Sequence, residues 1–216
     1  MALILLTIGP PLLILFYIIK SDRFMEPASA IIKVFLLGVS LLFPAIWLNG
    51  IFITDETAYL AGLTEESLKY LAFILIVTKL QEFDEKMDAI VYGTLISLGF
   101  ATYENYEYVY LYFPDSSYAI AWARAFSAIP LHAMCGVIMG YHLGMHYFEN
   151  KSNSNHLLLA LLIPILVHGS YNYLINYMPW HFIFLIGVLF YVVRLHKEFV
   201  IHQAHKKNSL EAEIKS

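Results

Sequence analysis

Two adjacent glutamates stand out because they lie in a long apolar stretch. Glu65 and Glu66 open the run EESLK, in which Lys69 lies one helical turn after Glu65. Two neighbouring carboxylates in a medium of low dielectric do not both ionise easily, so one of them can serve as a general base near neutral pH. The alternative is an acidic helix start with Thr64 as its N-cap, in which the glutamates only complement the helix dipole.

A third carboxylate, Glu104, ends a stretch that is uncharged from Ala89 to Tyr103. A charged side chain within a bilayer costs about 2.5 to 3.5 kcal/mol on insertion scales, so its presence requires a partner or a function. The alternative is an interfacial acid that Arg124, on the next span, neutralises.

Two histidines complete the set, His132 in HAMCG and His168 in HGSYN. His168 and Asn172 are four residues apart, so they share a helix face and can offer an imidazole and an amide to one substrate oxygen. Such donors form an oxyanion hole. The alternative for each histidine taken alone is a hydrogen-bonded packing residue.

The same side chains could hold zinc, whose usual protein ligands include imidazole and carboxylate. The candidate ligands are Glu66, Glu104, His132 and His168. The chain contains no HExxH, so a metal would take its ligands from separate helices, and the sequence leaves its presence open. Cys135 is the single cysteine and has no obvious activating base, which favours a packing role.

These residues belong to a membrane protein. Of the 216 residues, 59% are hydrophobic and 14% are charged, and the mean hydropathy is +0.64. Residues 1–19 and 34–54 form uncharged runs, each long enough to cross a hydrocarbon core of about 30 Å. The lipid bilayer is thus one partner, and the net charge of −4 argues against nucleic acid as another.

Apolar length and helix-breaking residues predict an all-α polytopic fold with about seven transmembrane helices. The predicted spans are 1–19, 28–49, 57–79, 88–110, 118–148, 156–177 and 180–200. We expect a single membrane-embedded domain over residues 1–200, followed by a polar cytoplasmic tail over residues 201–216.

Basic residues fall in or beside alternate connections and the tail, and the other connections contain none. They are Lys20, Arg23, Lys33, Lys79, Lys86, Lys151, Arg194, Lys197, Lys206, Lys207 and Lys215. By the positive-inside rule, this asymmetry predicts an outside N-terminus and a cytoplasmic C-terminus. The chemically interesting residues then lie nearer the outer surface.

The four clusters, in order, resemble the motif set of the PrsW family, which comprises intramembrane proteases of Gram-positive bacteria. The motifs are EExxK at residues 65–69, FxxxE at residues 100–104, His132, and HxxxN at residues 168–172. The similarity extends through the segments FDEKMDAIVYG, SLGFATYEN, GVIMGYHLG and VHGSYNY, and so covers nearly the whole chain.

The resemblance implies a peptidase of the bacterial cell membrane with Glu65 and Glu66 as its catalytic pair and His168 as their essential partner. Glu104 occupies the place where the related prenyl proteases carry a histidine, and a carboxylate there could bind metal, orient water or share a proton. The implied substrate is a single-span anti-sigma factor. The implied reaction is its first, extracytoplasmic cut, before another protease completes the release of a stress-response sigma factor.

Peptide hydrolysis needs a base for water, donors for the oxyanion and an acid for the leaving amine. We expect one of the paired glutamates to activate the water. Glu104 and His132 then orient that water or transfer protons, and His168 with Asn172 stabilises the oxyanion.

Another class of function remains open at this stage. Intramembrane glutamates and histidines also mark proton relays, so the alternative is a proton-coupled transporter or a non-catalytic membrane scaffold. The halves of the chain show no clear duplication of the kind that transporters often carry. A scaffold would tolerate Glu65→Gln, whereas a protease would not.

Overall fold

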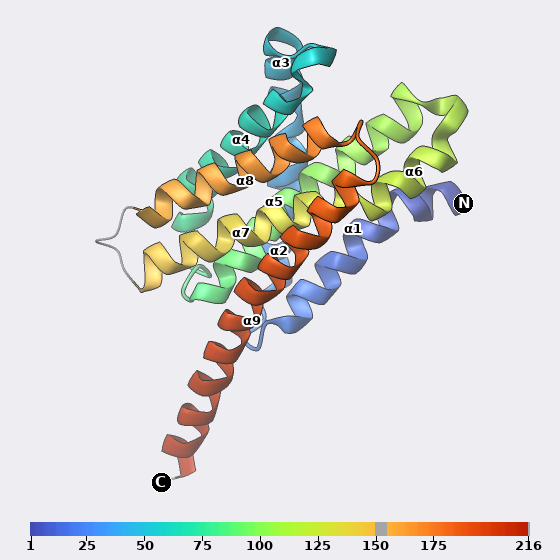
Figure 1. Cartoon of the computed structure of the whole chain (residues 1–216). Helices are drawn as coiled ribbons and strands as arrows, with labels where there is room; N and C mark the ends of the chain where they lie inside the picture. Colours follow the sequence, from blue (N-terminus) through green and yellow to red (C-terminus); the bar gives the residue numbers. More distant parts are fainter. Residues whose placement is uncertain (150–154, 216) are drawn as a thin grey trace.

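The computed structural model describes residues 1–149 and 155–215, and every regular element within them is helical (Figure 1). The α-helices are α1 (Ala2–Ser21), α2 (Ala28–Ser40), α3 (Leu42–Phe52), α4 (Ala61–Leu75), α5 (Lys86–Tyr106), α6 (Ser117–Phe126), α7 (Ala128–Phe148), α8 (Asn155–Leu174) and α9 (Trp180–Lys215). The short helical turns between them are η1 (Asp55–Leu60), η2 (Val77–Lys79), η3 (Glu107–Tyr112) and η4 (Pro114–Ser116).

Four helical stretches are long and apolar enough to cross a membrane, which agrees with the predicted all-α membrane fold. They are Ala2–Ser21, Ala28–Phe52, Pro114–Phe148 and Asn155–Leu174. The number of seven spans and the orientation with the N-terminus outside stay predictions. Lys151, in one of the predicted basic connections, lies outside the described residues.

Two of the predicted spans contain a break. The helix over residues 28–52 is interrupted at Leu41, between α2 and α3. The span predicted over residues 118–148 is divided at Ser127, whose backbone (φ −130°, ψ −77°) leaves the helical region between α6 and α7. The Ser127 hydroxyl donates to the Ala123 carbonyl at 2.7 Å, so the break is stabilised locally.

Helix α4 begins earlier than a cap at Thr64 would require. It starts at Ala61, directly after η1, so the alternative of Thr64 as N-cap is wrong. The Thr64 hydroxyl instead donates to Asn49 Oδ1 at 2.5 Å, across to α3. Fifteen residues give α4 a length of roughly 22 Å at about 1.5 Å per residue.

Helix α5 is the centre of the bundle and is buried along almost its whole length. It packs against α7, α2 and α1, while α8 lies on α7 and α4 (Figure 1). Small residues allow α5 and α7 to approach closely, as in many membrane helix pairs. A Cβ added to Gly93 or to Gly136 would lie 2.6 Å from the carbonyl oxygen of the other, so neither glycine has room for a side chain.

Candidate active site

The four predicted clusters meet because α4 and α7 begin where α5 and α8 end. Glu65 and Glu66 lie in the second turn of α4, and His132 lies in the second turn of α7. Glu104 lies in the last turn of α5, and His168 lies near the end of α8. The polar groups therefore gather toward one end of the bundle, in its interior.

Glu66 is the most connected carboxylate of this group. Its Oε1 accepts a hydrogen bond from Lys69 Nζ at 2.7 Å and lies 2.9 Å from His168 Nδ1. Glu66 and Lys69 are both fully buried. The ammonium also lies 4.3 Å from the centre of the Phe100 ring. A buried charge is tolerated only with a partner, so the Lys69–Glu66 pair compensates two charges that neither residue could keep alone.

His132 joins this pair to Glu104. Its Nδ1 lies 3.0 Å from Lys69 Nζ, and its Nε2 lies 3.0 Å from Glu104 Oε2. Because an ammonium can only donate, Nδ1 accepts, and the ring proton sits on Nε2 and is donated to Glu104. The contacts thus select one tautomer of His132.

Arg124 binds the same Glu104 oxygen that His132 contacts. Its Nη2 donates to Glu104 Oε2 at 2.6 Å, and its Nε donates to Asn105 Oδ1 at 2.9 Å. Asn105 in turn donates to the Thr7 carbonyl at 2.8 Å, which ties α5 to α1. Glu104 is therefore neutralised by Arg124, as the alternative without a catalytic role predicted, and it also contacts His132 directly.

Two carboxylate oxygens in this cluster have no hydrogen-bond partner among the described residues. They are Glu65 Oε2 and Glu66 Oε2, and both are buried. Glu65 is held by its other oxygen, which accepts from Asn49 Nδ2 at 3.2 Å, and its Oε2 lies 3.9 Å from His168 Nε2. Buried polar atoms are nearly always satisfied, so these two oxygens are suited to a ligand or to water.

A metal fits this arrangement. One ligand atom from each of Glu65, His132 and His168 lies within 4.8 Å of the others, and all three residues are buried. Two histidines and a glutamate form a common ligand set for catalytic zinc. Glu66, bonded to His168 Nδ1, stands where a carboxylate orients a metal-binding histidine. His132 would exchange one of its two present contacts for the metal.

The remaining predicted residues lie at the edge of the cluster. Asn172 is one turn beyond His168, and its amide donates to the Ala58 carbonyl at 3.3 Å, next to η1. Cys135 is buried, and its thiol donates to the Pro164 carbonyl at 3.8 Å, which is a packing contact.

Sequence reasoning assigned no role to three residues that complete the site. Lys69 bonds to Glu66 and His132, Asn49 bonds to Glu65, and Asn105 bonds to Arg124. Each is a polar side chain within or beside an apolar stretch, so its polarity was the available signal.

The cluster combines buried carboxylates and imidazoles with one compensating lysine, within a bundle of apolar helices. These are the groups that a membrane-embedded hydrolase requires. Comparison with known proteins gives the class a name. The family described as "PrsW family intramembrane metalloprotease" matches residues 26–196.

Three relatives are each named "Protease PrsW". Those of Oceanobacillus iheyensis and Bacillus subtilis are both 35% identical to this chain, over 78% and 81% of it and 80% and 83% of their own lengths. That of Clostridioides difficile is 36% identical, over 80% of this chain and 79% of its own length. No solved structure matches the chain.

The chain belongs to the PrsW family of intramembrane metalloproteases. The predicted resemblance, the membrane peptidase and the multi-pass bacterial membrane protein are confirmed.

Proposed function

We propose that this peptidase makes the first, extracytoplasmic cut in a single-span, membrane-anchored anti-sigma factor, after which further proteolysis releases a stress-response sigma factor. The convergence of Glu65, Glu66 and His168 in one buried cluster is the observation that carries the catalytic part of this proposal. The substrate class comes from the motif resemblance, and the side of the membrane comes from the distribution of basic residues.

Zinc is the metal that suits the donor set, with Glu65, His132 and His168 as its ligands. When bound, it would supply Lewis-acid polarisation of the scissile carbonyl.

The protein's own side chains would then activate the water and protonate the leaving amine. Glu66 would hold His168 through Oε1 and present its free Oε2 to the attacking water as general base. Lys69 would keep this carboxylate ionised within the apolar interior. Glu104, fixed by Arg124, would hold the tautomer and orientation of His132. Glu66 would then give the proton that it took from the water to the leaving amine.

Asn172 would act from the rim of the site. Its amide would leave the Ala58 carbonyl and donate to the oxyanion when a peptide enters. The scaffold and transporter alternatives gain no support, because the matching family and the similar relatives are proteases.

The test uses purified full-length protein in liposomes, with a candidate single-span anti-sigma factor that is tagged at both ends. We expect cleavage that 1,10-phenanthroline abolishes and added Zn²⁺ restores. Mass spectrometry should place the new terminus on the extracytoplasmic side of the substrate span. Chelator-resistant cleavage would contradict the metal assignment, and a terminus on the cytoplasmic side would contradict the proposed topology.

A further inference from the structure

A second group of carboxylates lies at the opposite end of α5 from the active site. Asp22 follows α1, Glu26 lies in the connection to α2, and Asp88 lies in the first turn of α5. One carboxylate oxygen from each lies within 4.8 Å of the others. Sixteen residues separate Asp88 from Glu104, which corresponds to about 24 Å along the helix at ~1.5 Å per residue. The two clusters are therefore separate sites.

In each aspartate, one carboxylate oxygen accepts hydrogen bonds from the protein and the other accepts none from the described residues. Asp88 Oδ2 accepts from the backbone N–H groups of Asp84 at 2.9 Å and Glu85 at 2.6 Å. Asp22 Oδ1 accepts from Phe24 N at 2.9 Å and Gln203 Nε2 at 2.8 Å. Asp88 Oδ1 and Asp22 Oδ2 accept no hydrogen bond from any donor in the described part of the chain.

The unpartnered oxygens are deeply buried, since Asp22 is 4% exposed and Asp88 is 0% exposed. Their burial makes this more than an acidic surface patch, because unpaired buried oxygens are costly unless a ligand satisfies them.

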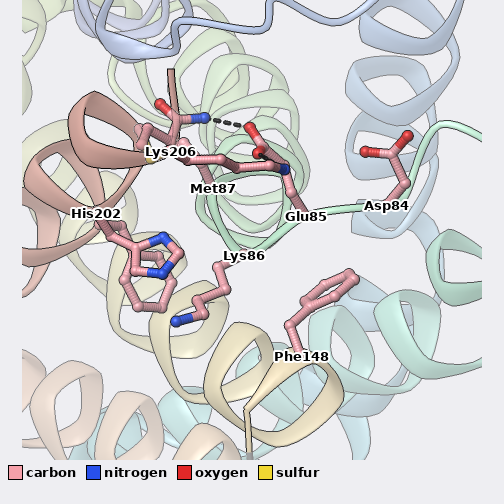
Figure 2. Close-up of a pocket in the computed structure, with 9 residues that line it drawn as sticks. Asp84, Glu85, Lys86, Met87, Phe148, His202 and Lys206 are labelled. Carbon is pink, nitrogen blue, oxygen red and sulfur yellow. Dashed lines mark hydrogen bonds and ion pairs between the residues drawn. The ribbon is translucent and has the colours of Figure 1, made fainter. Parts of the chain in front are cut away.

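The described side chains, those of residues 1–149 and 155–207, provide no ion pair for this group. No lysine or arginine among them comes within ion-pair distance of Asp22, Glu26 or Asp88. Lys206 pairs with Glu85 at 3.1 Å, and Figure 2 shows these two side chains next to each other on the wall of a neighbouring cavity. The Tyr92 hydroxyl donates to Glu26, and the carboxyl groups of Glu26 and Asp88 lie within hydrogen-bond range of each other. Three carboxylates thus lie together without a cationic partner among the described side chains.

We propose that Asp22, Glu26 and Asp88 bind a hard divalent cation, Mg²⁺ or Ca²⁺. Such ions take carboxylate oxygens as ligands, and the all-oxygen donor set distinguishes this site from the histidine-containing one. Glu26 is only partly buried, so the carboxylate group is not wholly enclosed by the protein. The bound cation supplies the missing positive charge.

The ion would join three parts of the chain at the end of the bundle that the basic residues predict to be cytoplasmic. Asp22 brings the end of α1, Glu26 brings the connection to α2, and Asp88 brings the start of α5. Gln203 of α9 donates both to Asp22 and to Glu85, so α9 is attached to the same group. Beside it, the cavity of Figure 2, of about 190 Å³, lies between α9 and the start of α5. The cation therefore strengthens a junction that is otherwise held by polar contacts around a cavity.

The experiment measures binding of MgCl₂ and CaCl₂ to the full chain in detergent micelles by calorimetry, with NaCl matched for ionic strength. Thermal unfolding is followed in parallel by tryptophan fluorescence. We expect one ion per chain for at least one of the two cations, and a higher unfolding temperature in its presence. Glu26→Gln and Asp88→Asn should each weaken binding at least tenfold.

Two controls isolate the site. Asp115→Asn removes an exposed carboxylate near the opposite end, and His168→Ala disables the active-site cluster; both should bind the cation as the unaltered chain does. If Asp88→Asn does not fold, Glu26→Gln decides, because its side chain is partly exposed. Absence of saturable binding, or equal binding by Glu26→Gln, would overturn the proposal. Stability that falls with rising pH and ignores both cations would show a shared proton instead, and would also overturn it.

Discussion

His168 Nδ1 lies 2.9 Å from Glu66 Oε1, although 102 residues separate them in the chain. This contact joins the second turn of α4 to the end of α8. It leaves Nε2 of the same ring facing Glu65, and Oε2 of the same carboxylate without a partner. One hydrogen bond therefore positions two groups that face the proposed reaction centre.

The first prediction separates metal ligands from the general base. Glu65→Gln and His168→Ala should lose both cleavage and bound zinc, whereas Glu66→Gln should lose cleavage and keep more of the zinc, because it acts on the metal only through His168. Zinc content of the purified proteins and cleavage in liposomes are the measurements. Glu107→Gln, on the next turn from Glu104, is the matched control and should retain both properties. Near-normal cleavage by Glu65→Gln, Glu66→Gln and His168→Ala would refute the site.

The second prediction concerns the buried ion pair. Lys69→Met should greatly lower accumulation, because removal of one member of a buried pair costs about 3 to 5 kcal/mol. The double variant Lys69→Met/Glu66→Gln should recover part of that stability, since neither charge of the pair remains, but it should not recover cleavage. Thermal unfolding of both proteins measures the difference. Equal stability of the single and double variants would mean that Lys69 does not balance Glu66.

The third prediction tests whether Arg124 must bond to Glu104 and Asn105 at the same time. Arg124→Lys keeps the charge but cannot reach both Glu104 and Asn105 with fixed geometry, because lysine lacks the planar fork of arginine. Loss of one hydrogen bond to a charged group is worth about 1.5 to 3 kcal/mol, so we expect cleavage to fall by roughly 10- to 150-fold. Arg23→Lys, at an exposed position, is the control for the same exchange. Unchanged cleavage by Arg124→Lys would show that charge alone is sufficient.

The fourth prediction addresses the contact between α5 and α7. Gly136→Val should prevent stable accumulation, because even a Cβ at this position would lie 2.6 Å from the Gly93 carbonyl oxygen. Gly187→Val makes the same change where no atom lies within 4 Å, and it should accumulate normally. Membrane-fraction immunoblots compare the two. Equal accumulation would mean that the helices can separate without cost.

The sequence predicted which polar residues come together better than it predicted how they pair. Charged and polar side chains in apolar stretches are costly, so Glu65, Glu104 and His168 could be proposed as site residues without a structure. The partner of Lys69 was not, because Glu65 and Glu66 both lie within one turn of it, and only the packing of α8 decides between them.

The helix breaks were missed because apolar length was given more weight than proline. Pro44 and Pro130 lie in the first turns of α3 and α7, where proline is typical of a helix start. Tertiary contacts accompany the second break, since Arg124, just before it, bonds to α5. Chain order and apolar length therefore predicted the class of fold, while the exact path of each span required the packed structure.

The close contact between α5 and α7 at Gly93 and Gly136 has a consequence for mutational screens. In a saturation screen that scores only survival of a reporter, Gly93 and Gly136 would be as intolerant as Glu66, although they carry no functional group. A map of sensitive positions would therefore include this helix contact together with the proposed active site. Protein abundance, measured for each variant, would distinguish the two groups, because we expect only the glycine variants to reduce the amount of protein.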